Sequence, residues 1–372
     1  MPWKPDAPYN ELPLLPPRVD FETRPVLKAT TRARAALAAM DEATKRMPNP
    51  MVLVNSISLL EAQASSEIEN IVTTTDELFR FAQEATDSAS AETKETLRYR
   101  TALFGGLEAI RKRPLSINTA IEVCTNIHRR DMRVRDLPGT YIGDPNTRSA
   151  IYTPPTGESV ILRKLDNWVD FVHTTADIDP LVVMAITHYQ FEAIHPFADG
   201  NGRTGRILNV LQLVEADLLR EPILYLSRFI IRNKSAYYRL LLGVTADAAW
   251  EEWILFVLRG IEETALQTLS KIDRIQALQN VMRTEIREQT TAGSNADLLD
   301  VLFENPYARI NDIVRRCGVS RPTATNWLNA LEAIGALVDL RVGRERLFIN
   351  QRFMQILSTD ETLPSASADR LF

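Results

Sequence analysis

The sequence feature that most constrains the fold is a glycine-rich loop, residues 195–206, enclosed by two apolar helical stretches. Before the loop, apolar residues follow two helical stripes between Val182 and Phe191, so this helix is apolar on nearly every side. After the loop, apolar residues again recur at helical spacing, at Ile207, Leu211, Val214 and Leu218. A helix that is apolar all round belongs in a protein interior, so we expect a mainly α-helical fold that holds the loop between buried helices.

The loop has the composition of a phosphate-binding segment. It contains three glycines, two arginines three positions apart, one histidine and one aspartate. Glycine lets the backbone approach an anion closely, and arginine supplies forked donors that suit phosphate oxygens. The following helix, expected to begin near Gly202, would direct its free N–H groups at the same anion. The alternative is a tight turn between helices, with surface arginines and a buried histidine.

Residues His195 to Arg206 resemble the signature loop of Fic-domain proteins, His-Pro-Phe-x-(Asp/Glu)-Gly-Asn-Gly-Arg-x-x-Arg, at every specified position. The resemblance implies a Fic-type helical domain with a β-hairpin flap. It also implies transfer of AMP from ATP to a Ser, Thr or Tyr hydroxyl of a target protein or of the chain itself, with release of pyrophosphate. The expected activity is therefore that of a protein adenylyltransferase.

The resemblance also assigns roles within the loop. His195 would be the general base and Asp199 the Mg²⁺ ligand. The predicted ATP-binding residues of this segment are His195, Gly200, Asn201, Gly202, Arg203, Thr204, Gly205 and Arg206. Among them, Asn201 and the amides of Gly200 and Gly202 would hold the α-phosphate, while Arg203 and Arg206 would clamp the β- and γ-phosphates. The chemistry is reasonable in itself, because an imidazole can accept a hydroxyl proton at neutral pH and a carboxylate suits Mg²⁺.

A second segment, residues 65–70, resembles the inhibitory helix of one class of this family, (Ser/Thr)-x-x-x-Glu-(Gly/Asn). Ser65, Glu69 and Asn70 match that pattern. The resemblance implies that Glu69 pairs with Arg206 and so disturbs ATP binding. The plainer interpretation is a capping box, in which Ser66 and Glu69 start a new helix.

Two further segments are expected near the site. Residues 139–155 are predicted to form a β-hairpin around an Asp-Pro-Asn turn. In Fic proteins the equivalent hairpin receives the target segment, although a plain surface hairpin is equally consistent with these residues. Asn233 is a natural helix N-cap and resembles the family position beside the adenosine end of ATP, with Tyr237 as a wall for the base.

Two further histidines and one polar segment are given a structural interpretation. His128 is interpreted as a surface or interfacial histidine, because nothing in the sequence places it near the loop. His188 is interpreted as a core histidine, and its spacing with His173 is weak support for a metal site. Residues 84–96, rich in Ala, Ser, Thr and Glu, are interpreted as a loose connection.

The chain divides into three predicted domains: residues 1–95 with the inhibitory segment, the catalytic domain 96–289, and residues 296–372. The second ends in a long helix over 250–289, and residues 290–295 have the composition of a linker. The third resembles a winged helix-turn-helix, which suggests DNA contacts from Arg321, Thr323, Thr325 and Asn326. Between Ala296 and Asn350, however, seven arginines face seven acidic residues. This balance favours protein contact or a homodimer over DNA.

Composition limits the remaining alternatives. A formal net charge of −5 argues against general adhesion to nucleic acid or membranes. Two cysteines, no apolar N-terminal run and no long apolar stretch predict a cytoplasmic protein without a membrane segment. The rival functions are a nucleotide-sensing DNA-binding regulator, and transfer of phosphate or UMP or removal of AMP on the same scaffold. Gly202 and Arg206 weigh against the kinase-like relatives, whose loop departs at those places.

Overall fold

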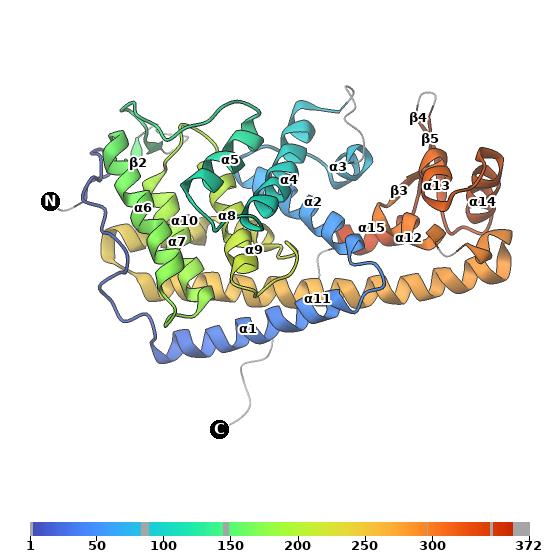
Figure 1. Ribbon diagram of the computed structural model, residues 1–372, viewed down its shortest axis with the longest axis horizontal. Helices are drawn as coiled ribbons and strands as arrows, with labels where there is room; N and C mark the ends of the chain where they lie inside the picture. The colour runs from blue at the N-terminus through green and yellow to red at the C-terminus, as the bar shows by residue number, and fades with distance from the viewer. Residues whose placement is uncertain (1–2, 83–88, 144–148, 296, 343–344, 360–372) are drawn as a thin grey trace.

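The computed structural model describes residues 3–82, 89–143, 149–295, 297–342 and 345–359. Two long helices, α1 (Arg24–Lys45) and α11 (Trp250–Gln289), lie side by side along the base of the molecule, and the shorter helices stand on them (Figure 1). α1 begins where the sequence allows it, because the Thr23 side chain accepts a hydrogen bond from the N–H of Val26 and a proline occupies the first turn. The mainly helical fold predicted from the sequence is confirmed.

The helices that stand on this base carry the glycine-rich loop. They are α2 (Met51–Ile68), α3 (Thr75–Phe81), α4 (Ala91–Ile110), α5 (Ile117–His128), α6 (Glu158–Thr174), α7 (Pro180–Ile194), α8 (Asn201–Glu215), α9 (Leu226–Arg232) and α10 (Lys234–Asp247). None of the described helices is both long and apolar enough to cross a membrane.

α7 is the buried centre of this group, as its all-round apolar sequence predicts. It packs against α6, α8 and α11. Two tryptophans donate their indole N–H groups to backbone carbonyls of α7, Trp168 to Thr187 at 2.9 Å and Trp253 to Ala185 at 2.7 Å. These bonds fix the helix on two sides, so the residue that ends it, His195, has a defined position.

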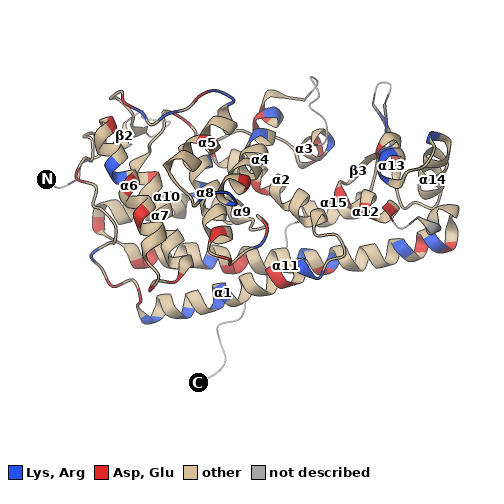
Figure 2. Ribbon diagram, viewed as in Figure 1, with Lys and Arg blue, Asp and Glu red and all other residues tan. Residues whose placement is uncertain are grey.

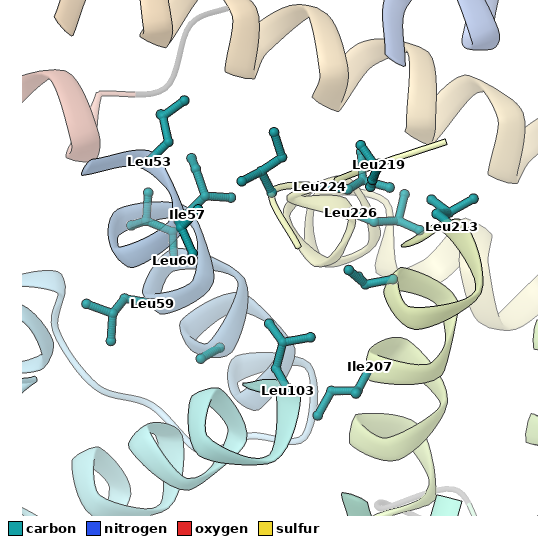
Figure 3. Close-up of a cluster of buried hydrophobic side chains, with 14 of the residues drawn as sticks. Leu53, Ile57, Leu59, Leu60, Leu103, Ile207, Leu213, Leu219, Leu224 and Leu226 are labelled. Atoms are coloured by element: carbon teal, nitrogen blue, oxygen red, sulfur yellow. The ribbon is translucent and has the colours of Figure 1, made fainter. Parts of the chain in front are cut away.

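An aliphatic cluster joins α2, α4 and α8 (Figure 3). Leu60 of α2, Leu103 of α4 and Ile207 of α8 are all less than 4% exposed. Burying such side chains stabilises the packing by about 1.5–3 kcal/mol each. The cluster therefore seats the end of α2, from which residues 65–70 lead out, against the start of α8.

A short hairpin and an N-terminal arm cover one end of α6 and α7. Strands β1 (Ile142–Gly143) and β2 (Ala150–Tyr152) pair antiparallel, and the predicted turn between them lies outside the described residues. The arm continues through turns, without helix or strand, as far as α1. It is tied down by a hydrogen bond from the N–H of Tyr9 to Thr153 O and by one from Lys164 Nζ to Leu12 O.

The C-terminal part has the element order of a winged helix. Its elements are α12 (Asp297–Glu304), β3 (Tyr307–Arg309), α13 (Ile310–Cys317), α14 (Arg321–Ala333), β4 (Val338–Val342), β5 (Glu345–Ile349) and α15 (Gln351–Ser358). The sheet has the antiparallel order β3-β5-β4. α15 packs back on α11, where Lys271 Nζ donates to Ile356 O at 2.8 Å. Both β3 and α15 are absent from the sequence-based prediction.

Two local predictions are wrong, at least in part. Ser66 and Glu69 do not start a helix, since Ser66 lies in the last turn of α2 and Glu69 follows its last residue. Residues 91–96 of the expected loose connection are helical, because the Ser90 side chain caps α4 at the N–H of Thr93, and residues 84–88 lie outside the described part of the chain. The predicted linker 290–295 includes a 3₁₀ turn, η1 (Thr291–Ser294).

Candidate active site

The glycine-rich loop leaves α7 and enters α8 through two left-handed backbone positions. His195 has φ 50° and follows the last residue of α7, while Gly200 has φ 81° and precedes the first residue of α8. Gly200 gives no side-chain cap, so the first N–H groups of α8 are not covered by a capping side chain. This end of α8 is therefore suited to an anion.

Asn201 closes the loop from within. Its Oδ1 accepts from the N–H of Phe197 and its Nδ2 donates to Phe197 O, both at 2.8 Å, and the residue is 2% exposed. The Asn201 side chain thus shapes the loop, and the backbone amides of α8 remain as anion donors. Thr204 is fully buried, and Gly205 packs against Glu192, whose carboxylate would meet a Cβ at 2.4 Å.

His195 is half-buried at the end of α7. Its Nδ1 has no hydrogen-bond partner among the described residues. Burial, with the nearby charge of Arg135 as a smaller cause, lowers the pKa of His195 to about 4. The imidazole is neutral at physiological pH, which is the form that can accept a proton.

Arg135 holds the backbone of His195 and is a site residue that the sequence reasoning missed. Its Nε donates to His195 O at 2.7 Å, and its Nη2 donates to Ile194 O and to Pro155 O. Its own N–H bonds to Pro196 O at 2.9 Å. A single guanidinium therefore ties the end of α7 to the chain just after the hairpin.

Arg206 is enclosed by the end of α2. Its Nη2 lies 2.8 Å from Glu69 Oε1 and 2.9 Å from Ser65 O, and its Nε donates to Ser65 Oγ at 2.8 Å. Glu69 also reaches the first turn of α8, because a Cβ at Gly202 would lie 2.3 Å from its Oε1. A carboxylate thus stands where the loop arginine and the α8 amides would otherwise receive an anion.

Asn70 explains why this segment carries Gly or Asn after the glutamate. It adopts φ 63° directly after Glu69, and the N–H of Ile71 returns to Ser66 O at 3.0 Å. Only glycine and asparagine adopt this left-handed conformation readily. Asn70 therefore ends α2 so that Glu69 points at the loop, and it makes no hydrogen bond with the loop among the described residues.

Asp199 lies at the open side of the loop. Its side chain is 63% exposed, and its Oδ1 accepts from the N–H of Gly200 at 2.6 Å. His128 of α5 lies beside it, with Nε2 at 3.9 Å from Asp199 Oδ2, and a Cβ at Gly200 would meet the same ring at 2.5 Å. The expectation that His128 lies away from the loop is wrong, because the packing of α5 on α8 brings it there.

Asn233 and Tyr237, expected beside the adenosine end of ATP, do not have the predicted arrangement. The Asn233 side chain donates to Phe229 O at 2.9 Å and does not cap α10. Tyr237 is 2% exposed, and its hydroxyl lies 3.0 Å from His188 Nε2, so it is packed in the core and presents no open wall. His188 is the predicted core histidine, with its pKa lowered to about 3 by burial. The described residues contain no cluster of three or more metal-ligating side chains.

Comparison with known proteins matches three family models to successive parts of the chain. They are the Fic/DOC family N-terminal model over residues 27–108, the Fic/DOC family model over 116–213, and the C-terminal domain of SoFic-like protein adenylyltransferases over 278–353. The glycine-rich loop 195–206 lies inside the second match, and residues 65–70 lie inside the first.

Individual relatives match more locally. A probable protein adenylyltransferase of Aquifex aeolicus is 31% identical over 39% of this chain and 43% of its own length. Protein adenylyltransferase fic-1 of Caenorhabditis elegans is 41% identical over 14% of this chain and 11% of its own length, so the chain matches less than half of either relative. A Fic family protein from Desulfovibrio desulfuricans shares the fold, with a TM-score of 0.56, 20% identity, and coverage of 90% of this chain and 98% of that one.

Proposed function

This chain belongs to the Fic/DOC family, and we propose that it is a protein adenylyltransferase held inactive by its own Glu69. In the proposed reaction, a hydroxyl oxygen of the target attacks the α-phosphorus of ATP. The bond from the α-phosphorus to the bridging oxygen breaks, pyrophosphate leaves, and AMP stays on the target oxygen. Protein adenylyltransferases among the matched relatives support this reaction class.

His195 would take the hydroxyl proton in this reaction. Its ring is neutral and can accept a proton, and its backbone is held in place by Arg135. Arg135 acts through His195, because it binds the backbone carbonyl of His195 and so holds the residue in place. Holding a base in place in this way supplies much of the advantage of an enzyme over solution.

The phosphates would be held by the α8 amides with Arg203 and Arg206. Transfer at phosphorus depends chiefly on positioning and on neutralising charge. Asp199 fits as the Mg²⁺ ligand, because a single exposed carboxylate suits an ion that keeps several waters and takes further oxygens from phosphates. When bound, Mg²⁺ would neutralise part of the phosphate charge.

The observation that carries the proposal is the position of Glu69. Its carboxylate pairs with Arg206 and contacts the Gly202 turn, so a negatively charged group already occupies the predicted phosphate site. A γ-phosphate would have to displace it. Inhibition follows, because ATP that cannot reach Arg206 is excluded or misaligned at its α-phosphorus.

The target would dock on the hairpin of residues 139–155. Ile151 of β2 is 39% exposed and Tyr141, just before β1, is 53% exposed, so this short sheet offers side chains and an edge to an extended segment. The end of the hairpin is tied to His195 through Arg135, which would connect target docking to the base. We place this activity in the cytoplasm, and a homodimer stays a prediction.

The proposal is tested by intact-mass analysis of the Glu69→Gly variant incubated with ATP and MgCl₂. We expect the mass of one or more AMP groups on the chain itself or on an added substrate protein. Addition of phosphate alone, or transfer from UTP in preference to ATP, would support the other transfer chemistries. Loss of AMP from a previously modified protein would indicate AMP removal.

The second candidate is a nucleotide-sensing DNA-binding regulator. The recognition helix α14 starts at the Ser320 cap and exposes Arg321 and Asn326, as the winged-helix reading expects. Arg321, however, donates to Asn311 at 2.7 Å, and the Thr325 hydroxyl is bonded to the carbonyl of Arg321. These internal bonds favour a protein-contact role for the domain over base recognition.

A further inference from the structure

Both phosphate-clamping arginines of the loop face a carboxylate. Arg206 pairs with Glu69, as described above. Arg203, one turn earlier on α8, places Nη1 at 2.7 Å from Oε1 of Glu95 on α4. Glu95 belongs to neither sequence motif, since it lies between the inhibitory segment and the loop in the chain.

We propose that Glu95 is a positioning residue that holds Arg203 in the orientation needed for the β-phosphate. This inference rests on the proposed function, because it takes Arg203 as a phosphate ligand. Glu95 would act before ATP arrives and remain in place afterwards. It would thus differ from Glu69, which must leave Arg206 before a γ-phosphate can enter.

Burial explains why Arg203 needs such a partner. Its side chain is only 3% exposed, and its Nε has no hydrogen-bond partner among the described residues. A buried guanidinium without a counter-charge is costly, and its orientation would be poorly fixed. Glu95 supplies the charge through one terminal nitrogen, which leaves other donors of the same planar group for an anion.

The helix that carries Glu95 is firmly held. Thr93 and Thr96, on either side of it, are fully buried, and Tyr99 one turn later donates to Glu61 of α2 at 3.1 Å. α4 also packs directly on α8. Glu95 therefore approaches Arg203 from a fixed helix, whereas Glu69 lies just past the end of α2.

The two carboxylates also lie differently relative to the anion site. Glu69 contacts the first turn of α8, where a Cβ at Gly202 would meet its oxygen. Glu95 reaches the Arg203 guanidinium from α4 through one contact. Protein kinases offer a physical parallel, because a glutamate there orients the lysine that binds the phosphates.

The test measures nucleotide affinity, so it does not depend on transfer activity. In the Glu69→Gly background, calorimetry with AMP and with ADP in the presence of MgCl₂ isolates the contribution of the β-phosphate. We expect Glu95→Ala to weaken ADP binding about tenfold, and AMP binding by less than about twofold. Glu95→Gln, which keeps an acceptor of the same shape, should lie between the parent and Glu95→Ala.

Controls separate the possible outcomes. Glu92→Gln, an exposed position one turn earlier on α4, should change neither affinity. In Arg203→Ala, which itself should lose the preference for ADP over AMP, the Glu95→Ala change should have no further effect. If Arg203→Ala keeps that preference, the phosphate role of Arg203 in the proposed function fails.

Two results would overturn the inference on Glu95 while leaving the proposed function intact. Equal weakening of AMP and ADP by both Glu95 variants would show a general structural role. Tighter ADP binding in Glu95→Ala would show that Glu95 competes with the phosphate as a second brake.

Discussion

Glu69 and Arg206 form an ion pair at 2.8 Å in which the arginine side chain is 3% exposed and the glutamate side chain is 36% exposed. The arginine is fixed by two further hydrogen bonds to Ser65. Among the described residues, the Glu69 carboxylate makes no hydrogen bond other than the one from Arg206, and it otherwise only contacts the Gly202 turn. The glutamate is therefore the partner that can leave. An anion with more charge, such as a triphosphate, can take its place on a guanidinium that stays where it is.

Glu69→Gly is expected to raise AMP incorporation severalfold, because it removes the carboxylate and frees Arg206. Scintillation counting of transferred radioactive AMP measures the change. The matched control is Glu67→Gly, which places the same flexible residue two positions earlier in the last turn of α2. Equal activation by both variants would show that loosening the helix, and not loss of the carboxylate, is responsible.

His195→Ala in the Glu69→Gly background should abolish transfer while nucleotide binding persists. The ring is needed for the proton, whereas the phosphates are held by other groups. A thermal-shift assay with ATP reports binding separately, since a ligand that binds the folded state raises the melting temperature. Transfer at the parental rate by His195→Ala would remove the histidine from the mechanism.

The pH dependence of kcat/KM should show no acidic fall near pH 6.5. Burial lowers the pKa of His195 to about 4, so the ring stays neutral and able to accept a proton down to that pH. Activity carried by this base should therefore be lost only as the pH falls through about 4. We expect nearly constant kcat/KM for Glu69→Gly between pH ~5.5 and ~7, where an ordinary histidine would lose most of its activity. A tenfold fall across that interval would contradict the low pKa.

Arg135→Ala should reduce kcat by about ten- to a hundredfold with a smaller change in nucleotide affinity, because misplacing a reacting group lowers the rate of chemistry. The arginine holds three carbonyls, of residues 155, 194 and 195. Arg133→Ala, at a position whose side chain is 81% exposed, is the control and should be neutral. If circular dichroism shows that Arg135→Ala is folded and kcat is unchanged, the proposed link to His195 is absent.

The local parts of the site could be predicted from the sequence. The loop is a continuous segment, and the helical spacing of apolar residues on both sides of it predicts the two flanking helices. The same period gives α11 the same ends in the sequence and in the structure, Trp250 and Gln289. Strand β3 was missed because three residues carry almost no periodic signal, and it forms only by pairing with β5.

The supporting residues could not be predicted, because they reach the loop from distant parts of the chain. Arg135 bonds to a carbonyl 60 positions away, and Glu95 pairs with an arginine 108 positions away. His128 reaches Asp199 only through the packing of α5 on α8. From the sequence alone, a charged residue on a helix is predicted to face solvent, and only the packing of the helices shows that it contacts the loop.

The winged-helix part should bind DNA weakly and without sequence preference, because its seven arginines between Ala296 and Asn350 are matched by seven acidic residues and three of them form ion pairs within the domain. The pairs are Arg315 with Asp312, Arg316 with Glu304, and Arg346 with Asp339. Both blue and red segments occur in this part of the chain (Figure 2). Each phosphate contact would steepen the fall of affinity with salt, so a domain without a net positive charge should give a shallow slope.

Fluorescence anisotropy with a labelled duplex, at ~0.05 M and ~0.2 M salt, measures that slope. The variant Asp312→Asn with Glu304→Gln unpairs two arginines and should bind DNA more tightly with a steeper slope. This variant is the positive control for the charge argument, because it changes the electrostatics and keeps the side-chain shapes. Tight binding by the unmodified chain, with a slope corresponding to several phosphates, would instead favour the DNA-binding regulator over a protein-contact role for this domain.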